Sequence, residues 1–126
     1  MTFTLLAPGL VRAIHDRVLN PGELTGEARD KSLEGALARV DNRMAYGMIG
    51  DVFDLAAAYA VAVATGHCFN DGKKRTAYEA MVVALELNGV VFEPNDEEVG
   101  PVVIAVAQGQ VDEVALAAWL RGTADG

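Results

Sequence analysis

The sequence predicts an all-α fold, a compact bundle of about five to seven helices. Hydrophobic residues make up 52% of the 126 residues and aromatic residues only 6%, which suits helices packed closely through small side chains. Apolar residues recur at helical spacing in several segments. The short apolar piece at 90–92 is too brief to form a sheet by itself. A chain of this length builds one core, so we expect residues 1–126 to form a single domain.

The first helix is predicted to begin near Pro8, because proline is tolerated in a first helical turn. Its apolar positions then follow helical spacing: Leu10, Val11, Ile14 and Val18. Asn20-Pro21-Gly22 should end it. His15 lies in this helix, where a histidine is most simply a packing or surface residue. Residues 22–31 are polar and contain two glycines, so we interpret them as a flexible loop.

The second helix is predicted from its cap and its apolar face. Asp30 or Ser32 can cap it, and Glu34 is favourably placed in its first turn. The apolar face consists of Leu33, Leu37 and Val40. We expect residues 41–50 to add a further short helix and a turn.

The central helix is predicted to follow Asp51, which can cap it. Residues 55–64 are apolar on every side, and this pattern indicates a fully buried helix. Gly66 is its expected end. At ten residues, this longest apolar run is too short to span a bilayer.

A second long helix should begin at Lys74 or Arg75 and end at Asn88-Gly89. The acidic residues after Asn95 predict another helix start. Residues 99–107 are ambiguous, since their Val and Ile content suits a strand and Gly100-Pro101 favours a break. Residues 111–120 form an amphipathic terminal helix, with Trp119 as a core anchor.

Charge and cysteine content narrow the function classes. The net charge of −8 argues against direct nucleic-acid binding and against binding to an anionic membrane. The single cysteine, Cys68, excludes an internal disulfide and fits a reducing compartment. No basic and then apolar leader opens the sequence. We therefore expect a cytoplasmic protein without a membrane segment.

The loop at 66–75 concentrates the chemistry of the chain. It contains a possible base in His67, a possible metal ligand in Asp71, and three of the ten Lys and Arg residues at 73–75. Three cations at a helix N-terminus oppose the helix dipole, and an anionic ligand such as a polyphosphate would reverse that penalty. The alternative is an ordinary Asp71-Gly72 turn flanked by solvated cations.

The stretch His67-x-Phe69-x-Asp71-Gly72-x-Lys74-Arg75 resembles the signature of the Fic/Doc superfamily, in its Doc (death-on-curing) toxin branch. Residues 14–16, 32–37 and 71–77 also resemble the Doc pattern, in the same order, so the resemblance covers nearly the whole chain. It implies a single Fic-type helical bundle with the motif loop between two central helices. It also implies ATP and Mg²⁺ as ligands, and group transfer to a protein hydroxyl.

The resemblance implies a role for each motif residue. His67 resembles the catalytic histidine, the general base on the attacking hydroxyl, and imidazole suits this proton transfer near neutral pH. Asp71 resembles the Mg²⁺ ligand, a carboxylate that a hard cation prefers. Phe69 resembles the buried aromatic residue that holds the loop in the core. The resemblance implies phosphate binding by Gly72, Lys73, Lys74 and Arg75.

The first of two departures from the wider family involves two positions and decides which reaction we expect. Tyr78 stands where AMP-transferring Fic enzymes carry a second arginine, and Lys74 replaces a glycine before Arg75. Both features resemble Doc toxins, which implies transfer of the γ-phosphoryl group to elongation factor Tu. AMP transfer to a protein hydroxyl is the alternative.

The second departure is Lys73, where the family has asparagine. A lysine brings a flexible point charge in place of a neutral donor. It could bind phosphate, displace the metal, or form a salt bridge with Asp71. It could also leave a catalytically impaired Fic-like binding module.

The family pattern also bears on partners. Residues 22–31 lie where the family has its target-docking flap. The inhibitory Fic motif has Ser or Thr four residues before a Glu-Gly or Glu-Asn pair. Glu34-Gly35 is its nearest match, but position 30 is Asp. We therefore expect no internal brake and a separate, Phd-like antitoxin. A thiol mechanism at Cys68 is disfavoured, because adjacency to His67 in sequence does not make a nucleophile–base pair.

Overall fold

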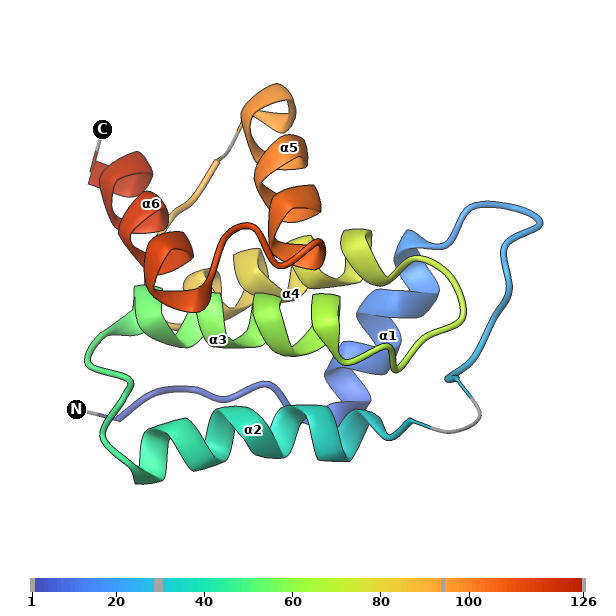
Figure 1. The fold of residues 1–126 in the computed structure, drawn as a ribbon, viewed down its shortest axis with the longest axis horizontal. Helices are drawn as coiled ribbons and strands as arrows, with labels where there is room; N and C mark the ends of the chain where they lie inside the picture. Colours follow the sequence, from blue (N-terminus) through green and yellow to red (C-terminus); the bar gives the residue numbers. More distant parts are fainter. Residues whose placement is uncertain (1, 29–30, 94, 126) are drawn as a thin grey trace.

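The computed structural model describes residues 2–28, 31–93 and 95–125, which form six α-helices (Figure 1). The helices are α1 (Pro8–Val18), α2 (Leu33–Ala45), α3 (Val52–Thr65), α4 (Lys73–Leu87), α5 (Asp96–Ala107) and α6 (Glu113–Asp125). In these ranges the β structure is limited to one isolated antiparallel bridge, between Glu27 and Phe69. The predicted all-α fold is therefore confirmed.

Helix α3 is the centre of the bundle. It lies beside α4 and contacts α2, α5 and α6 (Figure 1). Every residue from Leu55 to Ala64 is at most 8% exposed, because the alanines let neighbouring helices approach on all sides. The Asp51 carboxylate caps the helix by accepting from the Asp54 N–H at 2.9 Å. The predicted buried helix between Asp51 and Gly66 is therefore confirmed. The motif loop begins where this helix ends.

The N-terminal segment, residues 4–6, is hydrogen-bonded to α3 and to the end of α4. The Leu6 N–H donates to the Tyr59 hydroxyl of α3 at 2.9 Å. The Asn88 side chain, at the end of α4, accepts from the Thr4 N–H and donates to the Thr4 carbonyl. Helix α1 then packs against α4, and its His15 contacts the motif loop at Asp71 and Phe69.

The predicted end of α2 and the predicted start of α4 were wrong. Helix α2 continues through Ala45 as one helix, because Met44 falls four residues after buried Val40 and extends the same face. No separate helix forms over 41–50. Ser32 is its cap and accepts from the Gly35 N–H at 3.1 Å, while Asp30 lies outside the described residues. Helix α4 begins at Lys73, one residue earlier than predicted.

The ambiguous segment 99–107 belongs to helix α5. Buried Val99, Val103 and Val106 follow helical spacing, and Pro101 is accommodated inside the helix. Asn95 is the predicted start, and its side chain accepts from the Glu97 N–H. Helix α6 begins two residues later than expected and runs further, to Asp125.

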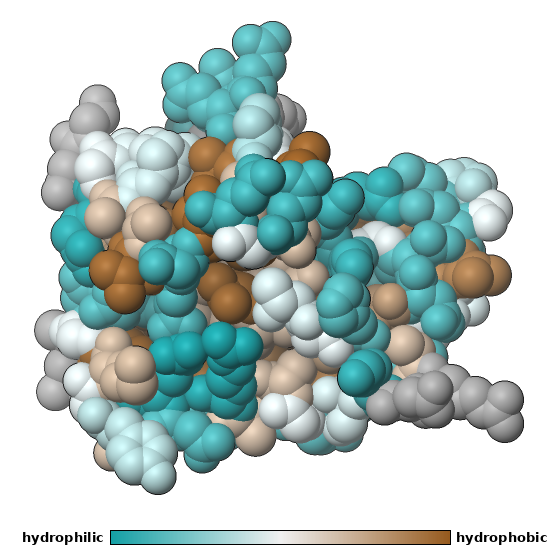
Figure 2. Space-filling view, viewed as in Figure 1, coloured by the Kyte–Doolittle hydropathy of each residue, from teal (hydrophilic) through white to brown (hydrophobic). Residues whose placement is uncertain are grey.

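The face shown in Figure 2 is mainly hydrophilic, with hydrophobic atoms visible as separate patches, several of them around α5 and α6. None of the helices in the described ranges combines the length and hydropathy needed to cross a bilayer.

Candidate active site

The motif loop joins the end of α3 to the start of α4. Gly66 ends α3 with its N–H donating to the Ala62 carbonyl at 3.0 Å, and His67 follows with φ 54°. A non-glycine residue in this left-handed region costs about 1–2 kcal/mol, and such residues cluster at functional sites. His67 is exposed, whereas its two successors Cys68 and Phe69 are buried. The imidazole of His67 is therefore exposed to solvent, while the next two residues hold the loop in the core.

A cavity of about 790 Å³ opens beside His67. Its walls come from the motif loop, the first turns of α4 including Tyr78, one face of α5, and Glu23. The residues from α5 are Val99, Gly100, Val103 and Ile104. The cavity thus joins a polar, cationic side to an apolar side, and its volume is that of a small-molecule site.

The polar side of the cavity is the N-terminus of α4. Gly72 caps this helix in the left-handed conformation, with φ 77° and no side-chain hydrogen bond to the cap. Its first turn contains no acidic residue and begins with Lys73, Lys74 and Arg75. Unpaired N–H groups and three cations converge there, and this arrangement favours an anionic ligand.

Asp71 is half-buried and held at two points. Its Oδ2 atom accepts from the Leu24 N–H at 2.8 Å, and its backbone carbonyl accepts from His15 Nε2 at 2.7 Å. In the described parts of the chain, no group of three or more His, Cys, Asp or Glu residues could hold a metal ion. The chain therefore offers Asp71 as a lone carboxylate, and a bound Mg²⁺ would need most of its oxygen ligands from elsewhere.

His15 supports the motif loop from α1. It is 1% exposed, and its ring stacks on Phe69 with centroids 3.9 Å apart and planes 12° apart. Because a carbonyl can only accept, the contact with Asp71 requires the proton on Nε2. The expectation that His15 is a packing residue agrees with its burial. Its hydrogen bond to the motif was not predicted.

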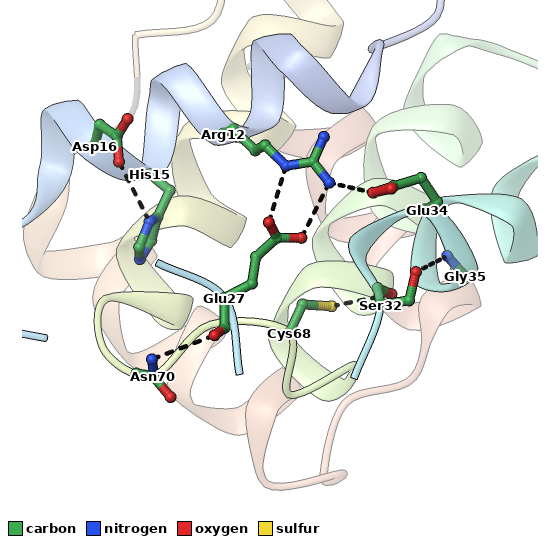
Figure 3. A network of polar contacts seen from close by, with 9 residues as sticks. All are labelled: Arg12, His15, Asp16, Glu27, Ser32, Glu34, Gly35, Cys68 and Asn70. Atoms are coloured by element: carbon green, nitrogen blue, oxygen red, sulfur yellow. Dashed lines mark hydrogen bonds and ion pairs between the residues drawn. The ribbon is translucent and has the colours of Figure 1, made fainter. Parts of the chain in front are cut away.

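Residues 20–28 lie along the motif loop. The Ala28 N–H donates to the Cys68 carbonyl at 2.6 Å, and the Asn70 side chain donates to the carbonyls of Thr25 and Glu27 at 3.4 Å. Figure 3 shows how this segment is fastened to α1. Arg12 binds the Glu27 carboxylate through two nitrogens, at 3.0 and 3.1 Å.

Arg12 also donates to Glu34 of α2. Glu34 was the nearest match to an inhibitory glutamate, and its ion pair is directed to α1. Glu23 contacts the motif instead. Its carboxylate pairs with the Arg75 guanidinium and accepts from the Asn20 N–H at 2.7 Å. Arg75 and, to a smaller extent, Asn20 lower the pKa of Glu23. A carboxylate thus already pairs with Arg75, one of the cations predicted to bind phosphate.

Lys73 does not contact Asp71. Among the residues that the structure describes, no ion pair joins the two, so the salt bridge considered from the sequence is not formed. The Lys73 ammonium lies 3.1 Å from His67 Nδ1. The motif position at which the family has asparagine therefore touches the candidate base directly.

Cys68 is fully buried, and its thiol donates weakly to the Ser32 carbonyl at 3.8 Å (Figure 3). Burial raises the pKa of this thiol, which keeps it protonated near neutral pH. Both observations agree with the expectation that the thiol is not the nucleophile.

Sequence reasoning missed Glu23, Leu24 and the role of His15. These residues lie 52, 47 and 56 positions from their motif partners, and no local pattern announces such contacts. The only available signal for Glu23 was its place in the flap-like segment of an otherwise cationic site.

Two comparisons bear on identity. The sequence model of the Fic/DOC family matches residues 5–85. The chain is also 36% identical over 118 residues to the protein kinase doc of Escherichia phage P1, a match that covers 92% of each chain.

Proposed function

Because this chain belongs to the Fic/DOC family, in its Doc branch, we propose that it is a toxin of a toxin–antitoxin pair. It transfers the γ-phosphoryl group of ATP to a hydroxyl group of a target protein. The target we propose is a translation factor resembling elongation factor Tu. The name of its phage P1 relative, protein kinase doc, supports phosphoryl transfer as the reaction class.

The observation that carries the proposal is the cavity between His67 and the N-terminus of α4. Its cationic side suits a polyphosphate, since Lys74 and Arg75 supply charge and the first turn of α4 supplies N–H donors. Its apolar side, from α5, suits a flat aromatic base. One cavity therefore offers complementary surfaces to both halves of a nucleotide.

His67 is the proposed general base. The target hydroxyl oxygen bonds to the γ-phosphorus while its proton passes to the imidazole, and the bond from phosphorus to the β–γ bridging oxygen breaks. ADP leaves with the electron pair of that bond. A positioned base of this kind contributes roughly 10²–10⁴ in rate. The rest of the barrier reduction comes from positioning and charge stabilisation, which the α4 N-terminus supplies.

Asp71 is the proposed Mg²⁺ ligand. Its Oδ2 atom accepts from Leu24, which leaves Oδ1 as the oxygen most readily offered to a metal. That donor set fits Mg²⁺ in the form in which it accompanies ATP, with phosphates and water as its remaining ligands. When bound, the ion would neutralise phosphate charge.

The test uses ATP labelled at the α or the γ position, incubated with the protein and purified elongation factor Tu, and in parallel with a cell extract. We expect label on a protein from γ-labelled ATP alone. Label from α-labelled ATP would establish AMP transfer and refute the kinase assignment. Tyr78, at the cavity wall, is the residue that motivates the kinase expectation.

A second candidate function is supported by the contact between Lys73 and His67. A lysine engaged with the base could leave a catalytically impaired module that binds nucleotide and partner only. The Lys73→Asn variant distinguishes the two. Expressed alone, it should arrest growth, and a neighbouring Phd-like antitoxin should restore growth. A folded Lys73→Asn protein that transfers no phosphate and leaves growth unaffected would refute the toxin proposal.

A further inference from the structure

The contact between Lys73 and His67 joins the two ends of the motif loop. His67 leaves the last turn of α3, and Lys73 is the first residue of α4. Their side chains meet with Nζ 3.1 Å from Nδ1, and Lys73 also lines the cavity. The ammonium therefore contacts the imidazole at the wall of the candidate nucleotide site.

The chemistry of the two groups fixes the direction of this hydrogen bond. An ammonium has three donors and no acceptor, and a lysine amine binds a proton far more tightly than imidazole does. Nδ1 must then be the acceptor, so the neutral His67 ring carries its proton on Nε2. In this state neither ring nitrogen can accept a proton.

The surroundings explain why the ammonium turns to the imidazole. The Asp71 carboxylate accepts from Leu24, and the Glu23 carboxylate pairs with Arg75. Neither of these carboxylates, both in described parts of the chain, forms an ion pair with Lys73, and the dipole of α4 repels a cation at its first residue. A neutral ring nitrogen is the acceptor that Lys73 reaches.

We infer that Lys73 is a positioning residue that withholds the His67 base until a polyphosphate occupies the cavity. The inference rests on the proposed function, in which the ligand is a nucleoside triphosphate. Phosphate oxygens carry full negative charge, so they attract the ammonium more strongly than a neutral imidazole does. When Lys73 moves to the phosphates, Nδ1 becomes available to the target hydroxyl. Nucleotide occupancy and base availability are thereby coupled through one side chain.

The test is ¹⁵N NMR of the imidazole nitrogens at a single pH, with ¹⁵N-labelled histidine and tripolyphosphate as the probe. The chain has two histidines, and His15, 1% exposed with its own hydrogen bond to Asp71, serves as an internal reference. Lys73→Met keeps the side-chain stem and removes the donor. Lys74→Met is the matched control, because Lys74 is the exposed neighbouring lysine.

In the protein without ligand, the His67 Nδ1 resonance should move downfield in Lys73→Met and stay in place in Lys74→Met. Tripolyphosphate should drive the parent resonance to the Lys73→Met position, and should leave the Lys73→Met resonance there. The inference is overturned if Lys73→Met leaves Nδ1 unshifted, or if bound tripolyphosphate leaves it unshifted or moves it upfield.

The NMR samples contain no acceptor protein, so these outcomes do not depend on phosphoryl transfer. If the NMR result holds and no label is transferred from ATP, the proposed function fails and the coupling stands. If label is transferred and Nδ1 does not respond, the coupling fails and the function stands.

Discussion

Substituting His15 tests whether the motif loop depends on its support from α1. In His15→Leu the side chain stays apolar and of similar bulk, but the Asp71 carbonyl loses its donor and Phe69 loses its stacked ring. Leaving a buried acceptor unpaired costs about 1–3 kcal/mol, and an aromatic pair adds about 0.5–1.5 kcal/mol. Because the hydrogen bond is only partly buried, we expect the lower part of the combined range, about 2 kcal/mol.

That loss converts to a measurable shift in melting temperature. At about 2.1 cal/mol/K per residue, 126 residues give an unfolding entropy near 0.26 kcal/mol/K, so His15→Leu should melt about 8 °C lower by calorimetry. His15→Gln, whose amide nitrogen can replace the Nε2 donor, should recover about half of the shift.

The same substitution separates a structural role from a positioning role. Below both melting temperatures, titration calorimetry of ATP with and without Mg²⁺ should show that His15→Leu has lost most of the metal dependence, because the Asp71 backbone is no longer fixed. A His15→Leu protein that melts within about 2 °C of the parent would refute the hydrogen-bond argument. One that melts lower but keeps the full metal dependence would limit His15 to stability.

Three further predictions concern charge. Glu23→Gln removes the carboxylate that pairs with Arg75 and would compete with a phosphate ligand for it. Calorimetry should therefore show that tripolyphosphate binds about 3–10-fold more tightly to the variant. Unchanged affinity would show that the ion pair does not oppose the ligand. In a Lys73→Asn background, His67→Ala should abolish label transfer from ATP. The affinity for ATP should stay within about twofold, because a general base acts on the target hydroxyl and not on the bound nucleotide. Full transfer would exclude His67 as the base. Burial opposes ionisation of Asp51, but its bonds to α6 and to the α3 cap outweigh that effect and lower its pKa. The stability that this carboxylate contributes is therefore present above its unfolded pKa, about 3.9, and is lost as the pH falls through the lower folded pKa. Asp51→Asn should reduce the acid-induced fall in melting temperature, and an identical fall in both proteins would contradict this account.

The sequence predicted the fold well wherever one segment carries its own pattern. Residues 55–64 are apolar all round, and Asp51 and Gly66 mark the ends of α3, so burial and boundaries could both be predicted. The pattern misled at 41–45, where the residues are mostly polar and the helix continues because its apolar face includes Met44. At 99–107 the sequence left helix and strand both open, because β-branched residues and Pro101 disfavour a helix. The segment is helical in α5, where Val99, Val103 and Val106 are buried at helical spacing.

For the candidate site, the sequence predicted which residues belong to the motif loop and could not predict how they pair. Asp71 was a possible partner of Lys73, but the ammonium contacts His67, and the Asp71 carboxylate accepts from the Leu24 N–H. That N–H comes from a segment 47 residues away in sequence, and the same segment is bonded to α1 through Glu27 and Arg12. Pairings of this kind are tertiary, so no local spacing encodes them.

The complete burial of α3 has a consequence for how the protein can move. An element packed on every side opens only when the whole fold opens, so the amide hydrogens of α3 should be among the last to exchange with deuterated solvent. Residues 20–28 are largely exposed and fastened by a few surface bonds, so their amides should exchange by local opening long before. His67 is then attached to the stationary side of the cavity and Glu23 to the mobile side. We therefore expect local opening of the 20–28 segment to limit the rates of ligand binding and release, while the backbone at His67 stays fixed.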